Sequence, residues 1–240
     1  MGSGIETFVI HLARATGRRA QVNKLLAGTP YPARILDAVD GAKVPEDQRK
    51  EEVSDKPLFE PAYPFAMSAG EYGCFQSHRV AWQLIVDEDL DAALILEDDV
   101  AQTEGFGAAV DLAAAHVGNF GYVQFQVRGV DEARVVSQAG GVSIVQPRVT
   151  PLRTSAQMVS RSAAKSLLDM TAQIDRPVDT FLQSHWHTGL HLTCVVPSGV
   201  EDRTAETGGS TISSQRSLWE KTKRDVQRSK YRREVKRLSL

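Results

Sequence analysis

The segment Ala92–Val100 (AALILEDDV) contains five apolar residues followed at once by three carboxylates. An apolar run of this length is typical of a strand that is buried on both faces. Adjacent carboxylates repel one another, and burial raises their pKa further. A divalent cation relieves that repulsion, and oxygen ligands favour Mg²⁺ or Mn²⁺ over zinc. Residues i and i+2 of an extended chain point the same way, so we expect Glu97 and Asp99 to share one ion. The alternative is a solvated acidic turn.

Strands and helices alternate around this segment. Ser68–Glu71 has the S-x-x-E spacing of a capping box, which predicts a helix that begins there and runs to about residue 87. We also predict strands at 7–12, 33–38, 121–127, 142–146, 155–160 and 190–196, and helices at 13–27, 45–53, 108–117, 161–171 and 178–184. This order favours an α/β sandwich with a mostly parallel central sheet, whose ligands bind outside the carboxyl ends of the strands.

The composition is that of an ordinary globular protein. Of the 240 residues 42% are hydrophobic and 24% charged, and the longest central apolar run is far shorter than a membrane span. Two cysteines, Cys74 and Cys194, are too few for a disulfide framework. Residues 1–4 resemble an expression remnant and no secretory leader is evident, so we expect a cytoplasmic location.

Charge divides the chain into two parts. Residues 215–240 contain ten basic and three acidic side chains, a net +7, whereas the remainder carries −9. We therefore expect one catalytic domain over residues 5–214 and a basic helical tail over 215–240. Such a tail is attracted to anionic surfaces. A solvated terminal helix and attachment at the inner face of the cell membrane both fit this pattern, and we do not expect nucleic-acid binding.

Several common catalytic motifs are absent from the sequence. It contains no P-loop, no dinucleotide-binding glycine pattern and no G-x-S-x-G nucleophile elbow. Three histidines, His185, His187 and His191, lie close together in the sequence, but Gly189 interrupts any helical metal-binding spacing. Core or surface roles suit them better, although the sequence leaves open whether one completes a metal site.

The order of several segments resembles glycosyltransferase family 25, the lipopolysaccharide-biosynthesis galactosyltransferases related to collagen galactosyltransferases. The matching segments are Phe8–Arg14 with Arg18–Arg19, Ala38–Gly41, Ser68–His78, Trp82, Ile95–Asp99, Thr154–Arg161 and Pro177–Asp179. The stretch 70–100 is the most specific. Gln157–Met158, where relatives often carry an aromatic residue, and Tyr122–Arg128 depart from the family pattern.

The resemblance implies a GT-A-like fold and inverting transfer of a sugar, most often galactose from UDP-galactose, to a saccharide or glycolipid acceptor. It also implies a divalent metal, Mn²⁺ or Mg²⁺, held by Glu97 and Asp99. By their position in the matching segments, the residues expected to bind the nucleotide and the donor sugar are Arg14, Arg18, Asp40, Gly41, Ser77, His78, Glu97 and Asp98. Asp179 is the candidate general base, with a helix cap as its alternative role.

Two other functional classes remain open at this stage. One is a non-catalytic relative that binds nucleotide sugars and recruits a membrane or a partner through its tail. The other is a metal-dependent phosphohydrolase, although the chain lacks the additional ligands that a two-metal site needs.

Overall fold

The computed structural model describes residues 4–204 and 218–239. Its centre is an eight-stranded sheet in the order β2-β1-β3-β8-β5-β9-β7-β6. The strands are β1 (Ile5–His11), β2 (Ala33–Asp37), β3 (Ala92–Glu97), β5 (Tyr122–Phe125), β6 (Ala133–Ala139), β7 (Val142–Pro147), β8 (Ala156–Ser160) and β9 (Thr193–Val196).

The sheet is mixed. The first strand, β1, pairs in parallel with both β2 and β3, and β5 pairs in parallel with β9. Between these units, β8 is antiparallel to both β3 and β5, and β7 and β6 extend the far edge as an antiparallel hairpin. The parallel unit β2-β1-β3 is the part that brings the carboxyl ends of β1 and β3 together.

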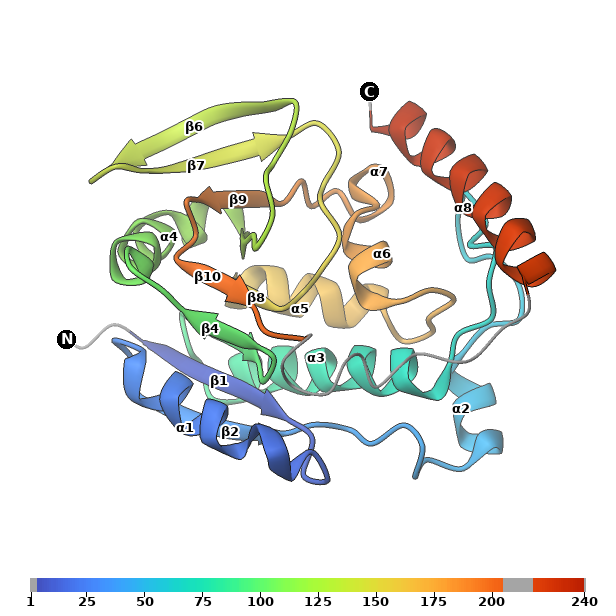
Figure 1. Ribbon diagram of the computed structural model, residues 1–240, viewed down its shortest axis with the longest axis horizontal. Coiled ribbons are helices and arrows are strands. Elements are labelled where there is room, and N and C mark those ends of the chain that lie inside the picture. Colours follow the sequence, from blue (N-terminus) through green and yellow to red (C-terminus); the bar gives the residue numbers. More distant parts are fainter. Residues whose placement is uncertain (1–3, 205–217, 240) are drawn as a thin grey trace.

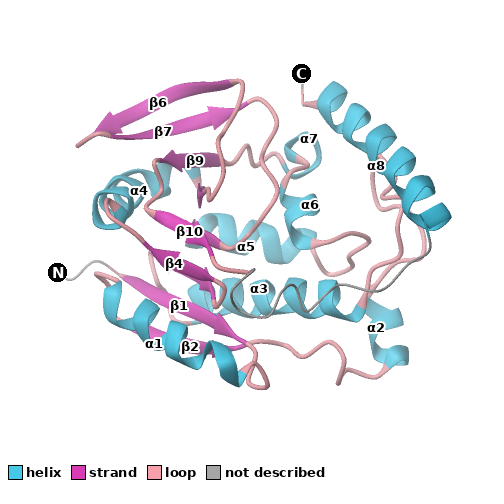
Figure 2. Cartoon of the chain, viewed as in Figure 1, coloured by secondary structure: helices cyan, strands magenta, loops and turns pink. Residues whose placement is uncertain are grey.

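Helices cover both faces of the sheet, as Figures 1 and 2 show. They are α1 (Arg19–Gly28), α2 (Glu46–Glu52), α3 (Ala69–Asp87), α4 (Phe106–Phe120), α5 (Arg161–Met170), α6 (Val178–Leu182), α7 (His185–Thr188) and α8 (Leu218–Leu238), with a 3₁₀ turn at Thr16–Arg18. In β3, Leu94 and Leu96 pack with α1 and α4, whereas Ala93 and Ile95 pack with α3 and α5. Because β3 is buried on both sides, its apolar run has no polar interruption until Glu97.

The α/β architecture predicted from the sequence is confirmed, with local corrections. The capping box at Ser68 and Glu71 is present, and α3 follows it as predicted. The first helix begins later than predicted, because residues 13–18 form turns at the end of β1 before α1 starts. Four elements of the structure were not predicted from the sequence, namely β4 (Val100–Gln102), β6, α7 and β10 (Val200–Asp202).

The two short strands β4 and β10 form a separate antiparallel pair directly after the acidic segment. Asp202 pairs in register with Val100, and the backbone N–H of Arg203 donates to the carbonyl of Asp99. Gly199 supports the turn before β10: its φ is +65°, and a Cβ there would lie 2.3 Å from the backbone nitrogen of Phe106. This pairing brings residues 202–204 beside the end of β3.

The described part of the basic tail is a packed helix. In α8, Tyr231 and Val235 are buried against the body, and Lys236 forms an ion pair with Glu132 at 3.1 Å. Figure 1 shows this helix in red along one side of the molecule. The predicted boundary at residues 214–215 lies outside the described residues. Among the described helices, none has the length and apolarity needed to cross a membrane.

Candidate active site

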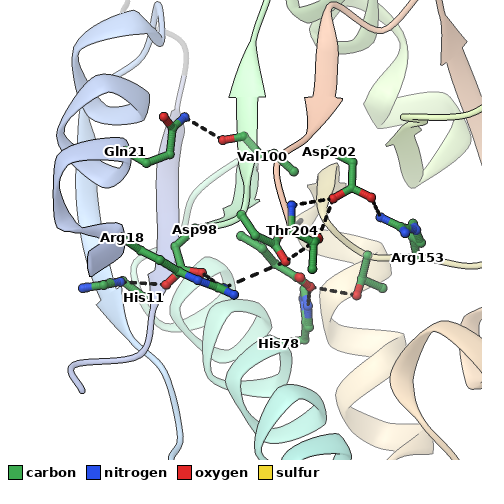
Figure 3. Close-up of polar contacts among 12 residues, drawn as sticks. His11, Arg18, Gln21, His78, Asp98, Val100, Arg153, Asp202 and Thr204 are labelled. Atoms are coloured by element: carbon green, nitrogen blue, oxygen red, sulfur yellow. Dashed lines mark hydrogen bonds and ion pairs between the residues drawn. The ribbon is translucent and has the colours of Figure 1, made fainter. Parts of the chain in front are cut away.

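The three acidic residues after β3 have different partners. Asp98 is buried, and each of its oxygens is engaged: one contacts Nδ1 of His11 at 2.7 Å and the other accepts from Arg18 at 2.6 Å (Figure 3). The parallel register explains the first contact, because Ile10 pairs with Glu97 and the next residue of β1 is therefore beside Asp98. Asp98 thus ties the end of β1 and the start of α1 to the end of β3.

Glu97 is held from the opposite side by α3 and the segment before β8. Its Oε1 accepts from Nε2 of His78 at 3.1 Å and from the hydroxyl of Thr154 at 3.0 Å. Nε2 of Gln157 lies 3.0 Å from Nδ1 of His78, a contact that orients the imidazole so that its Nε2 faces Glu97. Burial opposes ionisation of Glu97, but these hydrogen bonds outweigh it and hold its pKa below the ordinary value.

Asp99 is the carboxylate with an oxygen atom that accepts no hydrogen bond from any described residue. Its Oδ2 accepts from the hydroxyl of Thr204 at 3.1 Å and lies 3.9 Å from Arg18, whereas its buried Oδ1 has no hydrogen-bond partner among the residues that the structure describes. Burial, with the charges of Glu97 and Asp98, raises the pKa of Asp99 to about 6. A buried anionic oxygen without a partner is costly unless a ligand satisfies it.

A loop after β2 forms the facing wall of the site. Arg14 donates to Asp40 at 2.9 Å, and the backbone N–H of Val39 donates to the hydroxyl of Ser77 at 2.8 Å. The same hydroxyl donates to the carbonyl of Gly73, so Ser77 anchors this loop to α3. Glycine is needed on both sides of the contact: a Cβ on Gly41 would lie 1.8 Å from the carbonyl oxygen of Ala69, and one on Gly73 would lie 2.5 Å from that of Val39.

These side chains surround one cavity of about 370 Å³. Its lining includes all the residues that the sequence analysis assigned to nucleotide, sugar or metal: Arg14, Arg18, Asp40, Gly41, Ser77, His78, Glu97, Asp98 and Asp99. Ala69 and Gly70, in the first turn of α3, also line it. Because the first turn of a helix presents free backbone N–H groups, this arrangement suits an anion such as a phosphate.

Asp179 is not part of that lining. It lies in the first turn of α6, where Oδ1 accepts from the backbone N–H of Thr180 at 2.7 Å and Oδ2 from that of Arg153 at 3.3 Å. Arg153 has a φ of +92°, which a non-glycine residue rarely adopts, so Asp179 helps to hold an unfavourable backbone conformation. Burial raises the pKa of Asp179. The side chain of Asp179 therefore connects the start of α6 to residue 153, but it does not cap the helix, because the N-cap of α6 is Pro177.

Several residues at this site had no assigned role in the sequence analysis. Asp202 forms an ion pair with Arg153 and accepts from Thr204, which extends the polar network from Asp99 to the loop before β8 (Figure 3). His11 and Thr154 belong to segments that carry the family resemblance, and that was the available signal, whereas Gln157 was noted only as a departure from the family pattern. Nothing local marked Asp202 or Thr204, because β10 comes about 100 residues after β4 and reaches the site only by strand pairing.

The histidines near the end of the chain are elsewhere. His185 stacks on His191 with ring centroids 4.2 Å apart, and His187 stacks on Phe59 at 3.8 Å. None of them lines the cavity. Cys74 is closer, since its sulfur lies within 4.8 Å of ligand atoms of His78 and Glu97. Burial, followed by the nearby charge of Glu97, raises the pKa of the Cys74 thiol well above its ordinary value.

Comparison with known proteins identifies the family. The model of "Glycosyltransferase family 25 (LPS biosynthesis protein)" matches residues 5–182. The chain belongs to glycosyltransferase family 25. Its α/β sandwich and its cavity at the ends of β1 and β3 agree with the GT-A-like arrangement expected of this family.

Curated relatives match a shorter stretch. Human procollagen galactosyltransferase 2 is 33% identical over 97 residues, 40% of this chain and 16% of that protein. A Drosophila melanogaster glycosyltransferase 25 family member is 37% identical over 95 residues, 39% of this chain and 16% of that protein. The human inactive glycosyltransferase 25 family member 3 is 35% identical over 103 residues, 42% of this chain and 17% of that protein. This chain therefore matches only about a sixth of each relative's length.

A solved structure shows a weaker likeness. A glycosyltransferase involved in the glycosylation of the major capsid of PBCV-1 is 11% identical, with a TM-score of 0.35 over 76% of this chain and 67% of that chain. That score is too low to indicate function.

Proposed function

We propose that this glycosyltransferase moves galactose from UDP-galactose to a saccharide acceptor, with inversion at the anomeric carbon, in the synthesis of lipopolysaccharide or another surface glycan. The main support is the cavity, which the candidate nucleotide, sugar and metal residues line together with Asp99, whose Oδ1 has no hydrogen-bond partner in residues 4–204 and 218–239. The galactosyltransferases among the relatives support the choice of sugar.

The acidic residues fit a divalent metal ion, Mn²⁺ or Mg²⁺. Oxygen ligands suit both ions, and we assign them to the carboxylate of Glu97 and to Oδ1 of Asp99, which no described residue hydrogen-bonds. Asp98 is not available, because both of its oxygens are engaged by His11 and Arg18. When bound, such an ion neutralises the charge that develops on a departing diphosphate.

The protein's own groups account for the other parts of the reaction. Arg14, Arg18 and the first turn of α3 surround the space where we place the diphosphate, and they stabilise its negative charge. Asp179 is our candidate general base for the acceptor hydroxyl, and burial raises its pKa, which makes it a stronger base than an exposed aspartate. Since Asp179 does not line the cavity, this role requires the acceptor to approach from the side of Arg153.

The test is release of UDP from a panel of nucleotide sugars, with Mn²⁺, Mg²⁺ or EDTA, in the presence of an acceptor panel of oligosaccharides. We expect metal-dependent UDP release that is highest with UDP-galactose. If UDP binds but no donor is turned over with any acceptor, the protein instead resembles its inactive relatives and the catalytic proposal fails. Equal turnover in EDTA and Mn²⁺ would refute the metal assignment.

We also propose that the protein is cytoplasmic and attaches to anionic membrane surfaces through α8. Basic side chains are exposed along this helix: Arg228, Lys230, Arg232, Arg233, Lys236 and Arg237. Charge attraction of this kind is screened over about 8–10 Å at physiological salt. Sedimentation with phosphatidylserine vesicles should therefore fall steeply between about 50 and 300 mM salt, because the Debye length shortens as the salt concentration rises. Salt-independent binding would refute an electrostatic attachment.

A further inference from the structure

A second and larger cavity, of about 680 Å³, lies between α2, residues 53–68 and the start of α3. The residues that matter here are Arg49, Tyr63, Phe65, Ser68 and Tyr72. This volume is within the range of cavities that bind small organic ligands. None of the sequence-based assignments falls in this cavity except for the capping residue Ser68.

Three aromatic side chains are among the residues that line this second cavity, and other contacts hold them in place. Tyr63 packs edge-on against Phe65 at 5.5 Å and against Tyr231 of α8 at 5.6 Å. The guanidinium of Arg224 lies 3.9 Å from the centre of the Phe65 ring. The hydroxyl of Tyr72 donates to Glu52 at 2.8 Å, which fixes α2 against α3. The cavity therefore presents preformed aromatic surface.

Arg49 supplies an unused donor on the α2 side. Its Nε is shielded from solvent and has no hydrogen-bond partner within the described parts of the chain. The neighbouring Lys50 is already paired with Glu46 at 2.7 Å. Arg49 also lines the cavity, and its guanidinium group carries further N–H donors that an acceptor oxygen of a ligand could engage.

The two cavities share one lining residue, at the N-terminal end of α3. Ser68 lines both of them, and its hydroxyl is held by Glu71 in the capping box. A molecule in the larger cavity therefore lies beside the space where we place the donor. Aromatic faces attract the polarised C–H groups of a sugar ring, while the polar rim suits its hydroxyl groups.

We propose that this second cavity binds the non-reacting sugar residues of an oligosaccharide acceptor, with Arg49 donating to one of their oxygens. The inference rests on the proposed glycosyltransferase function and adds to it the position of the acceptor. It predicts that the enzyme distinguishes an oligosaccharide from the monosaccharide at its reacting end, because only the oligosaccharide reaches Arg49.

The test compares wild type with Arg49→Ala, using the best oligosaccharide of the acceptor panel and its terminal monosaccharide. Loss of a charge-assisted hydrogen bond should lower kcat/KM for the oligosaccharide about tenfold or more. The kcat/KM for the monosaccharide and the Kd for UDP should not change. Gln48→Ala is the matched control, because Gln48 is exposed on the same helix and does not line the cavity.

A binding measurement separates this inference from the proposed function. Wild type and Arg49→Ala are applied to the same oligosaccharides immobilised on an array, with UDP and Mn²⁺ and without any donor sugar. Weaker binding by the variant supports the subsite even if no turnover is found. Equal binding, or an equal loss of kcat/KM with both acceptor lengths, would overturn it.

Discussion

Replacing Asp99 by Asn should remove transfer activity and, in metal-free buffer, make the protein more stable. The pKa of Asp99 is raised from its ordinary 3.8 to about 6, mainly by burial, and its side chain is only 18% exposed. The folded state therefore disfavours the ionised form. At about 1.4 kcal/mol per pKa unit, the cost of ionisation reaches about 3 kcal/mol. Asn has no charge to bury and can still accept from Thr204.

The sign and the pH range of this effect follow from linkage. Because the folded-state pKa is the higher one, wild type loses stability relative to Asp99→Asn as pH rises from about 4, and the difference levels off above about pH 6. Urea denaturation in EDTA at pH 4.5 and pH 7.5 measures it. A variant that is less stable than wild type at pH 7.5 would refute the reasoning, because Asp99 would then be a stabilising anion. Glu104→Gln, at an exposed acid, is the control.

Three further substitutions test other parts of the structure. Gly73→Ala places a Cβ 2.5 Å from the carbonyl oxygen of Val39. We therefore expect the variant to lose about 1–3 kcal/mol of stability and to bind UDP more weakly in calorimetry. Unchanged UDP affinity would contradict the tight contact. Asp179→Asn should reduce transfer by about 10²-fold or more. Because burial raises the pKa of Asp179, the variant should also gain stability relative to wild type as pH rises above about 4. Full activity of the variant would exclude Asp179 as the base. Tyr231→Ala should lower the free energy of unfolding, measured by heat or urea, by about 3 kcal/mol. Val226→Ala, at a side chain that is 66% exposed, should change that free energy little. Equal effects of the two substitutions would mean that α8 is not packed against the rest of the protein.

The sequence predicted the elements whose local signals are strong. β3 was recognisable because its apolar run ends abruptly at Glu97, and α3 because Ser68 and Glu71 form a capping box. By contrast, β6 lies at the edge of the sheet, and its Val135 is 55% exposed, so it has neither a clear alternating pattern nor a buried face. The short strand β10 has only three residues, too few to give a periodic signal.

The site was predictable to a similar extent. Residues near β1, β2, α3 and β3 converge on one cavity because the carboxyl ends of parallel strands lie at one edge of a sheet. The partners of each carboxylate depend on strand register, so the contact of His11 with Asp98 could not be derived from spacing. Asp202 and Thr204 depend on pairing between strands about 100 residues apart. No local pattern could reveal them.

The unequal partners of the three adjacent acids affect how genetic variation at this site should be interpreted. Both oxygens of Asp98 are engaged inside the protein, one by Arg18 and the other by His11. Removal of one member of a buried ion pair commonly costs about 3–5 kcal/mol of stability. A variant screen that scores only product would record losses at Asp98 and Asp99 as the same phenotype. Protein abundance in cells would distinguish the two kinds of variant. We expect a change at Asp98 to reduce the amount of folded protein, and a change at Asp99 to leave abundant but inactive protein.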